Sequence, residues 1–418
     1  MKSLTFLWLA WKSLGSRKLT IFLTTLTLAL SVTLFMMIGR IKTASQQSFL
    51  NTVSKVDLIV GAKGGSLELL LYSVFHLGSA TNNIRYDSFL KYQKNPQISA
   101  LIPISLGDSH KGFRVVGTDN QFFDYFRFCG DKNLKFVAGQ IFSGAQEVVL
   151  GSAVAKELNY KIGDEIYLSH GTESAGIIKH DDFSFKVSGI LDLTHTPVDR
   201  SVYVPLLGLE AIHADWQEGY KKERLSELDL STLKISSITS FMVIAKNRIA
   251  SLFLRQAIYN DNQFNLMAII PGIELSNMWQ ALSYMENALN GISGLVIVIG
   301  FLSMLIILFN TLENRRREMA IYRSLGASPW AVLFLLILES GLLASFGALL
   351  GILLTNLFSL FARPLIYQHF GLYLEIPFIT HQELSFLLWF ILGGFFVGLL
   401  PAVKAYRNTL QDGLMVNL

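Results

Sequence analysis

The sequence contains very little cysteine and comparatively little charge. Its 418 residues include a single cysteine, Cys129, so no disulfide can form within the chain and its folded parts must be stabilised by packing. Charged residues make up only 16% of the chain and hydrophobic residues 51%, and the mean hydropathy is positive. This composition is too apolar for an ordinary soluble protein of this length, so we expect a membrane protein.

Motifs that carry enzyme chemistry are also absent from the sequence. It has no His-Glu-x-x-His, no Gly-x-Ser-x-Gly and no paired aspartates in an apolar run, which argues against an intramembrane or extracytoplasmic hydrolase. It also lacks the Gly-x-x-x-x-Gly-Lys-Ser/Thr loop that binds ATP phosphates. The stretch "GAKGGS" at 61–66 has a different spacing and predicts a turn.

Long apolar runs are what the sequence has in abundance. Four runs reach about 18 residues or more, the length that spans a bilayer. A cleaved signal peptide is the alternative for the first run, but its apolar core exceeds the ~7–15 residues typical of one. We therefore predict four transmembrane helices, at 20–39, 281–312, 328–361 and 384–403.

The remaining segments follow from these spans. Residues 40–280 mix strand-like and helical patterns, which predicts an extracytoplasmic α/β (α+β) domain of two subdomains inserted between helices 1 and 2. Residues 1–19 predict an amphipathic helix in contact with membrane lipids on the cytoplasmic side. Residues 362–383 form an extracytoplasmic loop and 404–418 a cytoplasmic tail in this prediction.

Orientation is predicted from the basic residues in short segments beside the spans. Such residues stay on the cytoplasmic side, and their clusters all fall on one side of the predicted helices, so both termini are expected inside. The net charge of +4 is therefore explained by the orientation of the chain in the membrane, and we expect no nucleic-acid partner. The basic residues concerned are Lys12, Arg17 and Lys18, then Arg315, Arg316, Arg317 and Arg323, then Lys404 and Arg407.

Histidines and acidic residues of the outer domain raise the question of a metal site. Imidazole and carboxylate suit Zn²⁺, but their spacing here matches none of the tight zinc motifs. We favour solvent-exposed loop histidines, with 170–182 as a surface loop, and keep a metal site as the less favoured alternative. The residues of that alternative are His170, His180, Asp181 and His195.

A charged segment lies between the second and third spans, at 313–327. Gly326 suits the position after a helix, Ser328 an N-cap and Pro329 the first turn of the next helix. The segment is predicted to form a helix with Met319 and Tyr322 on an apolar stripe. Its arginines alone would be explained by their role in keeping this segment on the cytoplasmic side of the membrane. The added glutamates and the apolar stripe instead favour docking to a soluble partner.

The sequence from Glu313 to Gly351, "ENRRREMAIYRSLGASPWAVLFLLILESGLLASFGALLG", resembles the permeases of the MacB, FtsX and LolC/LolE superfamily, the type VII ABC transporters. The stretches "VVLGSAVAKELNYKIGDEIYLS", "VSGIL" and "VYVPL" resemble their outer domain. One span, an outer domain and then three spans is also the order of that family. The resemblance covers nearly the whole chain.

The resemblance implies a permease of the bacterial inner (plasma) membrane that couples ATP hydrolysis to movement of its outer domain by mechanotransmission, for export or extraction of a substrate. It also implies a second permease copy, identical or related, and a cytoplasmic ABC ATPase dimer that binds the ATP and Mg²⁺. The chain itself would then bind no cofactor and be no enzyme. An FtsX-like signalling subunit without cargo is the alternative, and a periplasmic adaptor, lipoprotein or hydrolase is a further expected partner. The ATPase-coupling residues in this resemblance are Glu313, Arg315, Arg316, Arg317, Glu318, Met319, Tyr322 and Gly326.

Polar and small residues within the spans complete the candidate sites. Glu339 lies about ten residues into the third span, where an ionisable group is costly and usually faces protein or water. Structural hydrogen bonding and direct participation in coupling both remain open for it. Two Gly-x-x-x-Gly pairs, Gly347 with Gly351 and Gly394 with Gly398, predict close helix packing within one subunit.

Overall fold

The computed structural model of the protein describes residues 18–52, 55–78, 80–170, 178–214, 216–217, 220–221, 233–314, 321, 328–370 and 378–412. The chain divides into two compact units. The first consists of residues 1–44, 283–366 and 374–418, and the second of 45–282 and 367–373. The predicted amphipathic helix at 1–19 lies outside the described residues except for its last two positions.

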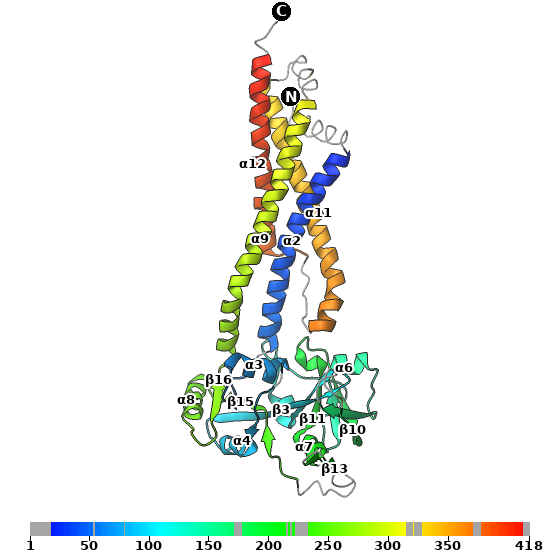
Figure 1. Ribbon diagram of the computed structural model, residues 1–418, viewed down its shortest axis with the longest axis vertical. Coiled ribbons are helices and arrows are strands. Elements are labelled where there is room, and N and C mark those ends of the chain that lie inside the picture. The colour runs from blue at the N-terminus through cyan, green and yellow to red at the C-terminus, as the bar shows by residue number, and fades with distance from the viewer. Residues whose placement is uncertain are drawn as a thin grey trace, which may run out of the picture. The chain divides into compact units, whose positions relative to one another are not determined.

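Long apolar helices make up the first unit (Figure 1). Among the described residues, four helices are long and apolar enough to cross a membrane, and the α/β domain lies between the first and second of them. This confirms the predicted fold class. The helices are α2 (Lys18–Thr52), α9 (Pro271–Asn314), α11 (Pro329–Phe370) and α12 (His381–Asp412).

All four helices extend beyond the spans predicted for them. Helix α11 continues to Phe370 and α12 runs from His381 to Asp412, so the predicted loop at 362–383 is wrong for 362–370 and 381–383, and the predicted tail is wrong for 404–412, all of which are helical. Helix α2 continues past residue 39 to Thr52, through a stretch with no proline or glycine after Gly39 to end it. Helix α9 begins at Pro271, well before residue 281, because proline is well suited to the first turn of a helix. Helices α2 and α9 therefore each have one part in each unit.

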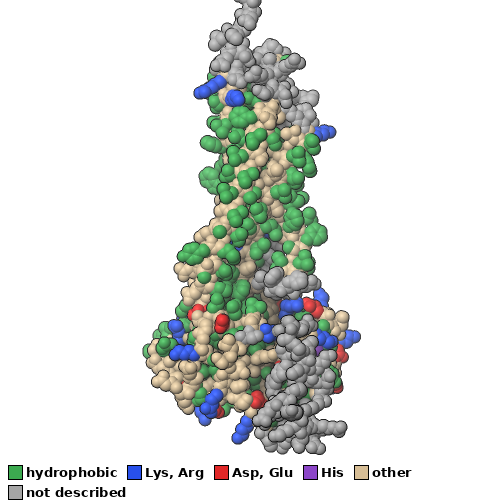
Figure 2. All heavy atoms as spheres, in the orientation of Figure 1, with side chains coloured by type: hydrophobic (Ala, Val, Ile, Leu, Met, Phe, Trp, Pro, Cys, Tyr) green, Lys and Arg blue, Asp and Glu red, His purple; other side chains and the backbone are tan. Residues whose placement is uncertain are grey.

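The helices of the first unit pack around an apolar core. The main cluster includes Leu28 and Val32 of α2, Met304 of α9, Leu343 of α11 and Phe390 of α12, all buried. The faces turned outward are also apolar, and Figure 2 shows hydrophobic side chains along the visible length of the helices. An apolar exterior and interior together are what a hydrocarbon environment requires.

The second unit is an α/β domain built on a ten-stranded mixed sheet in the order β16-β1-β15-β3-β4-β11-β8-β10-β7, with β9 paired to β10 and β3. Its helices are α3 (Ser66–Phe75), α4 (Tyr86–Gln93), α5 (Asn120–Tyr125), α6 (Ser152–Glu157), α7 (Leu206–Ala214), α8 (Arg248–Tyr259) and the short 3₁₀ turn η1 (Pro197–Arg200). Its sheet strands are β1 (Leu58–Ala62), β3 (Ile98–His110), β4 (Phe113–Thr118), β7 (Phe136–Gly139), β8 (Glu147–Leu150), β9 (Glu165–His170), β10 (Ile178–Leu191), β11 (Ser201–Pro205), β15 (Ser240–Ala245) and β16 (Leu266–Ile269). Three short pairs lie apart from this sheet: β2 (Ile84–Arg85) with β14 (Ser237–Ile238), β5 (Arg127–Phe128) with β6 (Lys132–Asn133), and β12 (Trp216–Gln217) with β13 (Tyr220–Lys221).

Strand β3 is shared by the two halves of this sheet. Its first half, from Ile98 to Ile104, pairs with β15, and its second half pairs with β4 and β9. The pairings β3-β4-β11-β8-β10-β9-β3 return to their starting strand, so the strands of this half form a closed ring. A core of aliphatic and aromatic side chains around Val148, Ile166 and Phe185 belongs to this closed part.

The mixture of strands and helices predicted for residues 40–280 is confirmed, and one predicted loop is wrong. Residues 147–170 contain β8, α6 and β9, and α8 follows at Arg248–Tyr259. The surface loop predicted at 170–182 is wrong for residues 178–182, which belong to β10. Backbone pairing does not require apolar side chains, and Ile178 pairs with His170 and Lys179 with Ser169 before the register shifts ahead of Ser184.

Candidate functional site

Most of the predicted coupling segment lies outside the described residues. This applies to Arg315, Arg316, Arg317, Glu318, Met319, Tyr322 and Gly326. Glu313 is the next-to-last residue of α9, and its side chain is not described. The predicted cap after this segment is confirmed, because the Ser328 hydroxyl accepts the Ala331 backbone N–H and α11 begins at Pro329.

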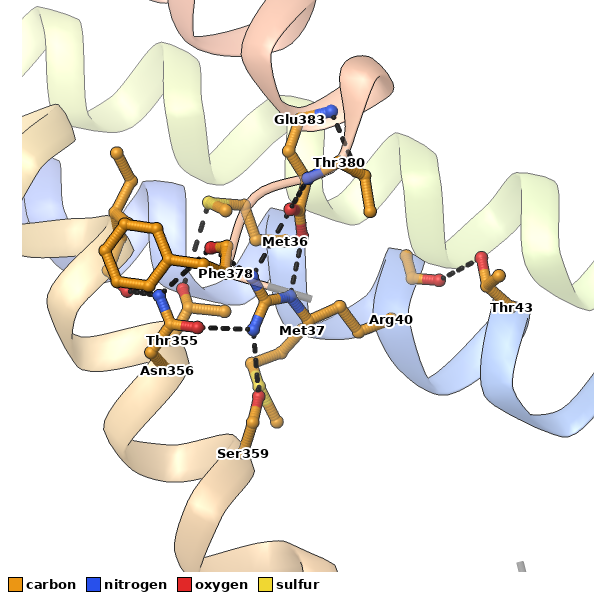
Figure 3. Close-up of polar contacts among 12 residues, drawn as sticks. Met36, Met37, Arg40, Thr43, Thr355, Asn356, Ser359, Phe378, Thr380 and Glu383 are labelled. Atoms are coloured by element: carbon orange, nitrogen blue, oxygen red, sulfur yellow. Dashed lines mark hydrogen bonds and ion pairs between the residues drawn. The ribbon is translucent and has the colours of Figure 1, made fainter. Parts of the chain in front are cut away.

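A buried ion pair connects two helices of the membrane unit. The Arg40 Nε of α2 donates to Glu383 Oε1 of α12 at 2.6 Å, and Arg40 Nη2 donates to Glu383 Oε2 at 3.3 Å (Figure 3). The two side chains are only 6% and 11% exposed. Two parallel contacts of this kind fix the orientation of both side chains.

Helix α11 and the segment before α12 complete the shell around the guanidinium. Arg40 Nη1 donates to the Asn356 side-chain oxygen at 3.1 Å and to the Ser359 hydroxyl at 3.3 Å, and Nη2 reaches the Phe378 carbonyl at 3.4 Å. Glu383 accepts the Thr380 N–H at 2.8 Å and donates its own N–H to the Thr380 hydroxyl at 3.2 Å. Arg40 therefore holds together α2, α11 and the start of α12, and we call Arg40, Asn356, Ser359, Thr380 and Glu383 the arginine clasp.

The clasp was not among the predicted sites, although the sequence contains indications of it. Arg40 follows the first apolar run and Glu383 precedes the last one, so opposite charges lie at the ends of two spans that face the same side. The residues Thr380-His-Gln-Glu383 also form the Thr-x-x-Glu pattern of a capping box, which predicts a helix start at this point. Which span ends are neighbours cannot be read from the sequence, so the partnership itself was not predicted.

The glycines of both Gly-x-x-x-Gly pairs lie at contacts between helices of the same chain. A Cβ on Gly347 would lie 2.6 Å from the Leu28 Cβ, and one on Gly351 would lie 2.7 Å from the Val32 Cβ. These two positions bring α11 against α2. On α12, a Cβ on Gly394 would lie 2.2 Å from the Ala344 Cβ, and one on Gly398 would lie 1.8 Å from the Ser340 hydroxyl, both on α11.

Glu339 lies on α11 beside the contact made by Gly398. Its side chain is buried, with 6% of the residue exposed, and its neighbour Ser340 is fully buried. Glu339 therefore faces the interior of the helix bundle, as a membrane-embedded carboxyl group generally must.

The parts of α2 and α9 that belong to the second unit are anchored in the core of the α/β domain. Phe49 of α2 lies 4.5 Å from the Phe75 ring and 5.7 Å from the Trp279 ring of α9, measured between centroids. Leu275 of α9 is buried in the same cluster, and Glu274 accepts a 2.8 Å hydrogen bond from Ser66. Both helices thus end in packed contact with the domain rather than in a loose linker.

The same two helices also contact each other within the membrane unit. The Ser31 hydroxyl of α2 donates to the Val296 carbonyl of α9 at 3.2 Å, and Lys42 of α2 forms an ion pair with Glu286 of α9. A Cβ on Gly300 would lie 3.0 Å from the Ser31 hydroxyl, which shows how closely the helices approach. Contacts between α2 and α9 are therefore present in both units.

Comparisons with known proteins identify the family. The MacB-like periplasmic core domain matches residues 21–249, which is more than half of the chain, and the FtsX-like permease C-terminal domain matches residues 290–410. The chain belongs to the MacB/FtsX family of ABC permeases. Four apolar helices and a MacB-like periplasmic domain fit an inner-membrane permease with an extracytoplasmic domain. Membership in this family also implies partnership with an ABC ATPase in general.

Solved structures similar to this permease include two outer domains. The periplasmic region of MacB from Actinobacillus actinomycetemcomitans is 13% identical, with a TM-score of 0.35, over 56% of this chain and 95% of that one. The extracellular domain of the noncanonic ABC-type transporter YknZ from Gram-positive bacteria is 10% identical, with a TM-score of 0.30, over 51% of this chain and 98% of that one. None of the curated proteins compared with the permease matches it.

The histidines considered as metal ligands do not form a described metal site in the permease. Among the residues that the structure describes, no group of three or more His, Cys, Asp or Glu side chains could hold a metal ion. His195 has a left-handed backbone with φ of 57° in the turn before η1. The side chains of His170, His180 and Asp181 lie outside the described part of the permease, although their backbones belong to β9 and β10.

A buried serine and histidine of the permease are close enough to resemble a catalytic pair. His76 Nδ1 lies 2.8 Å from the Ser201 hydroxyl, which itself donates to the Pro197 carbonyl at 3.0 Å. Burial lowers the pKa of His76 from 6.5 to about 4, and the nearby Arg114 adds to this effect. The serine proton is already committed to a carbonyl and both residues are buried, so the pair joins α3 to β11 rather than activating a nucleophile.

Proposed function

We propose that this chain is the permease subunit of an ABC transporter that exports or extracts a substrate by mechanotransmission. In this proposal a separate cytoplasmic ABC ATPase dimer binds Mg²⁺ and ATP, and its closure moves the outer domain through α2 and α9. The coupling segment at 313–327 contacts the ATPase, both termini are cytoplasmic, and a second permease copy completes the assembly. The 418 residues contain no ATP-binding loop of their own, which supports a separate ATPase.

One observation carries the mechanical part of the proposal. Both α2 and α9 run without interruption between the membrane unit and the α/β domain, and each is packed into the domain core at its end. An α-helix transmits displacement along its axis far better than a flexible linker does. Movement at the membrane end of either helix would therefore reach the domain around Phe49 and Trp279.

The first test is affinity purification of the tagged full-length chain from native membranes in mild detergent. We expect a soluble ABC ATPase to co-purify in stoichiometric amounts and to hydrolyse ATP in the complex. Loss of ATPase association in Met319→Asp is expected because an aspartate would disrupt the predicted apolar stripe without changing the basic residues of the segment. Val137→Asp is the control, since Val137 is 68% exposed on β7 of the α/β domain and lies outside both the coupling segment and the predicted spans.

Each outcome of this experiment has a distinct meaning. Retention of the ATPase by Met319→Asp would show that the apolar stripe does not bind it. Absence of any ATPase in several detergents would contradict the coupling proposal as a whole. If the ATPase co-purifies together with a cell-wall hydrolase and no substrate is moved in reconstituted vesicles, the FtsX-like signalling alternative replaces transport.

A further inference from the structure

Helix α8 of the outer domain exposes an unusual amount of apolar surface. Its inner face, including Leu254 and Ile258, is buried in a cluster shared with β15 and β16. Its outer face carries four large apolar side chains, where a solvated helix would present polar ones. These are Ile249, Leu252, Phe253 and Tyr259, which are 67%, 57%, 65% and 63% exposed, and we call them the α8 surface.

The charges beside the α8 surface are positive. Lys246, Arg248 and Arg255 are exposed on or next to the helix, and the Lys63 ammonium lies 5.7 Å from the centre of the Tyr259 ring. Basic and hydrophobic side chains lie side by side in Figure 2 over the part of the domain where Figure 1 places α8.

The acidic side chains near α8 are engaged in other contacts. Asp261 pairs with Lys91 at 2.8 Å and accepts a hydrogen bond from Tyr92. Asp57 accepts the Ala245 backbone N–H, and burial raises its pKa. Asp57 also attracts Arg248, which partly offsets the rise in its pKa. We call Lys63, Lys246, Arg248 and Arg255 the α8 rim, and apart from this attraction its positive potential is left for a ligand of opposite charge.

A polar residue within the α8 surface distinguishes a protein ligand from a lipid one. At 100° per residue, Gln256 lies between Leu252 and Ile249 on the outer face, so it is near the centre of the apolar patch. Its amide donates to the Asn260 side chain at 3.3 Å and has further hydrogen-bonding capacity. Inserting this amide into acyl chains would leave that capacity unsatisfied, whereas a protein backbone can satisfy it.

We propose that the α8 surface docks an amphipathic segment of a separate extracytoplasmic protein, in which apolar side chains are flanked by Asp or Glu. Phe253 and Leu252 would form the apolar centre of the contact, with Gln256 bonded to the partner backbone. Arg248 and Arg255 lie together on one side of the helix, so acidic residues along one edge of the segment would fix its direction. This docking does not depend on ATPase coupling, and it can fail or succeed without affecting that proposal.

Photocrosslinking in the native host tests the docking directly. The full-length chain carries p-benzoylphenylalanine in place of Phe253 or Ile249, and the crosslinked peptides are identified by mass spectrometry. We expect both positions to crosslink to one segment of another protein that contains apolar and acidic residues. The control replaces Val137, which is 68% exposed but lies on β7, and it should give no crosslink to that segment.

Charge reversal then tests the role of the rim. Arg248→Glu combined with Arg255→Glu should reduce the crosslinked product at least tenfold, and reversing the acidic residues of the identified segment should restore it. Lys132→Glu is the matched control, since Lys132 is exposed on β6. The apolar buried face of α8 is unchanged in these variants, although Arg255→Glu removes the 3.4 Å hydrogen bond from Arg255 Nε to the Ala268 carbonyl of β16. An unchanged Cys129 labelling rate would show that the domain remains folded.

Other crosslinking results would overturn the proposal. Crosslinks to a second copy of the chain would assign the α8 surface to self-association, and crosslinks to phospholipid would assign it to the membrane. A crosslinked segment without acidic residues, or a product insensitive to charge reversal, would contradict the predicted chemistry. No crosslink from either position would show that the surface is not a docking site under the conditions in the cell.

Discussion

Arg40 and Glu383 form a bidentate ion pair that is almost completely withdrawn from solvent, although they lie 343 positions apart in the sequence. Removing water from two charges is costly, and their attraction offsets that cost only if the other hydrogen-bonding groups are also satisfied. The clasp meets this condition through Asn356, Ser359 and Thr380. Removing either charged residue should therefore strongly destabilise the clasp.

The first prediction concerns the removal of one charge from the clasp. Glu383→Gln should destabilise the membrane unit by about 3–5 kcal/mol, because it leaves the Arg40 charge buried without its counterion. Unfolding of the purified full-length chain in mixed micelles measures this change. Arg40→Met combined with Glu383→Met should recover part of the loss, since no unpaired charge remains.

An exposed ion pair supplies the control for the clasp. Arg85 and Asp87 form one on the outer domain with side chains 74% and 58% exposed, so Asp87→Asn should cost less than about 1 kcal/mol. Equal effects of Glu383→Gln and Asp87→Asn would show that the clasp does not behave as a buried pair.

A second prediction concerns close packing of α11 and α12. Gly394→Ala should destabilise the membrane unit by about 1–3 kcal/mol, because its Cβ would overlap the Ala344 Cβ. Gly291→Ala on α9 is the control, since nothing lies within 4 Å of a Cβ there. Thermal unfolding of both variants in the same detergent gives the comparison. A larger effect at Gly291 would mean that another molecule packs against α9 at that position.

The sequence predicts those features that depend on local composition. The four membrane helices follow from apolar length, and the start of α11 follows from Ser328 and Pro329. The helix extensions are harder to predict, because residues 40–52 and 271–280 are polar enough to belong to a soluble domain and hydrophobicity alone does not reveal their continuity. The clasp depends on which span ends are neighbours, which is a property of the packed bundle.

The third prediction concerns acidity and the outer domain. Asp119 caps α5 by accepting the Gln121 N–H, and burial raises its pKa from 3.8 to about 6. The folded chain therefore binds this proton more tightly than the unfolded chain does. The resulting stabilisation is complete below about pH 3.8 and is lost as the pH rises through about 6.

Asp119→Asn isolates this effect, because asparagine caps a helix about as well as aspartate and does not ionise. At pH 7.5 the variant should be more stable than the parent by on the order of 1–2 kcal/mol, and the difference should shrink as the pH falls through 6. The labelling rate of Cys129 by a pyridyl disulfide reports local opening, since Cys129 lies shortly after α5 and its N–H donates to the Asn51 carbonyl. A stability difference that is the same at pH 5 and pH 7.5 would rule out Asp119 as its source.

The last prediction tests the mechanical role of α9 under the proposed function. Ala288 is exposed on α9 in the part that belongs to the first unit, and Ala288→Pro should remove one helical hydrogen bond and kink the helix, at a cost of about 3 kcal/mol. ATPase association should be retained because residues 313–327 are unchanged, while movement of the substrate should fall at least tenfold for each ATP hydrolysed. Ala288→Gly, which costs only about 1 kcal/mol and leaves the hydrogen bond in place, should retain most of the coupling. Full coupling in Ala288→Pro would mean that force reaches the outer domain through α2 alone or by another route, because a broken α9 cannot transmit axial displacement.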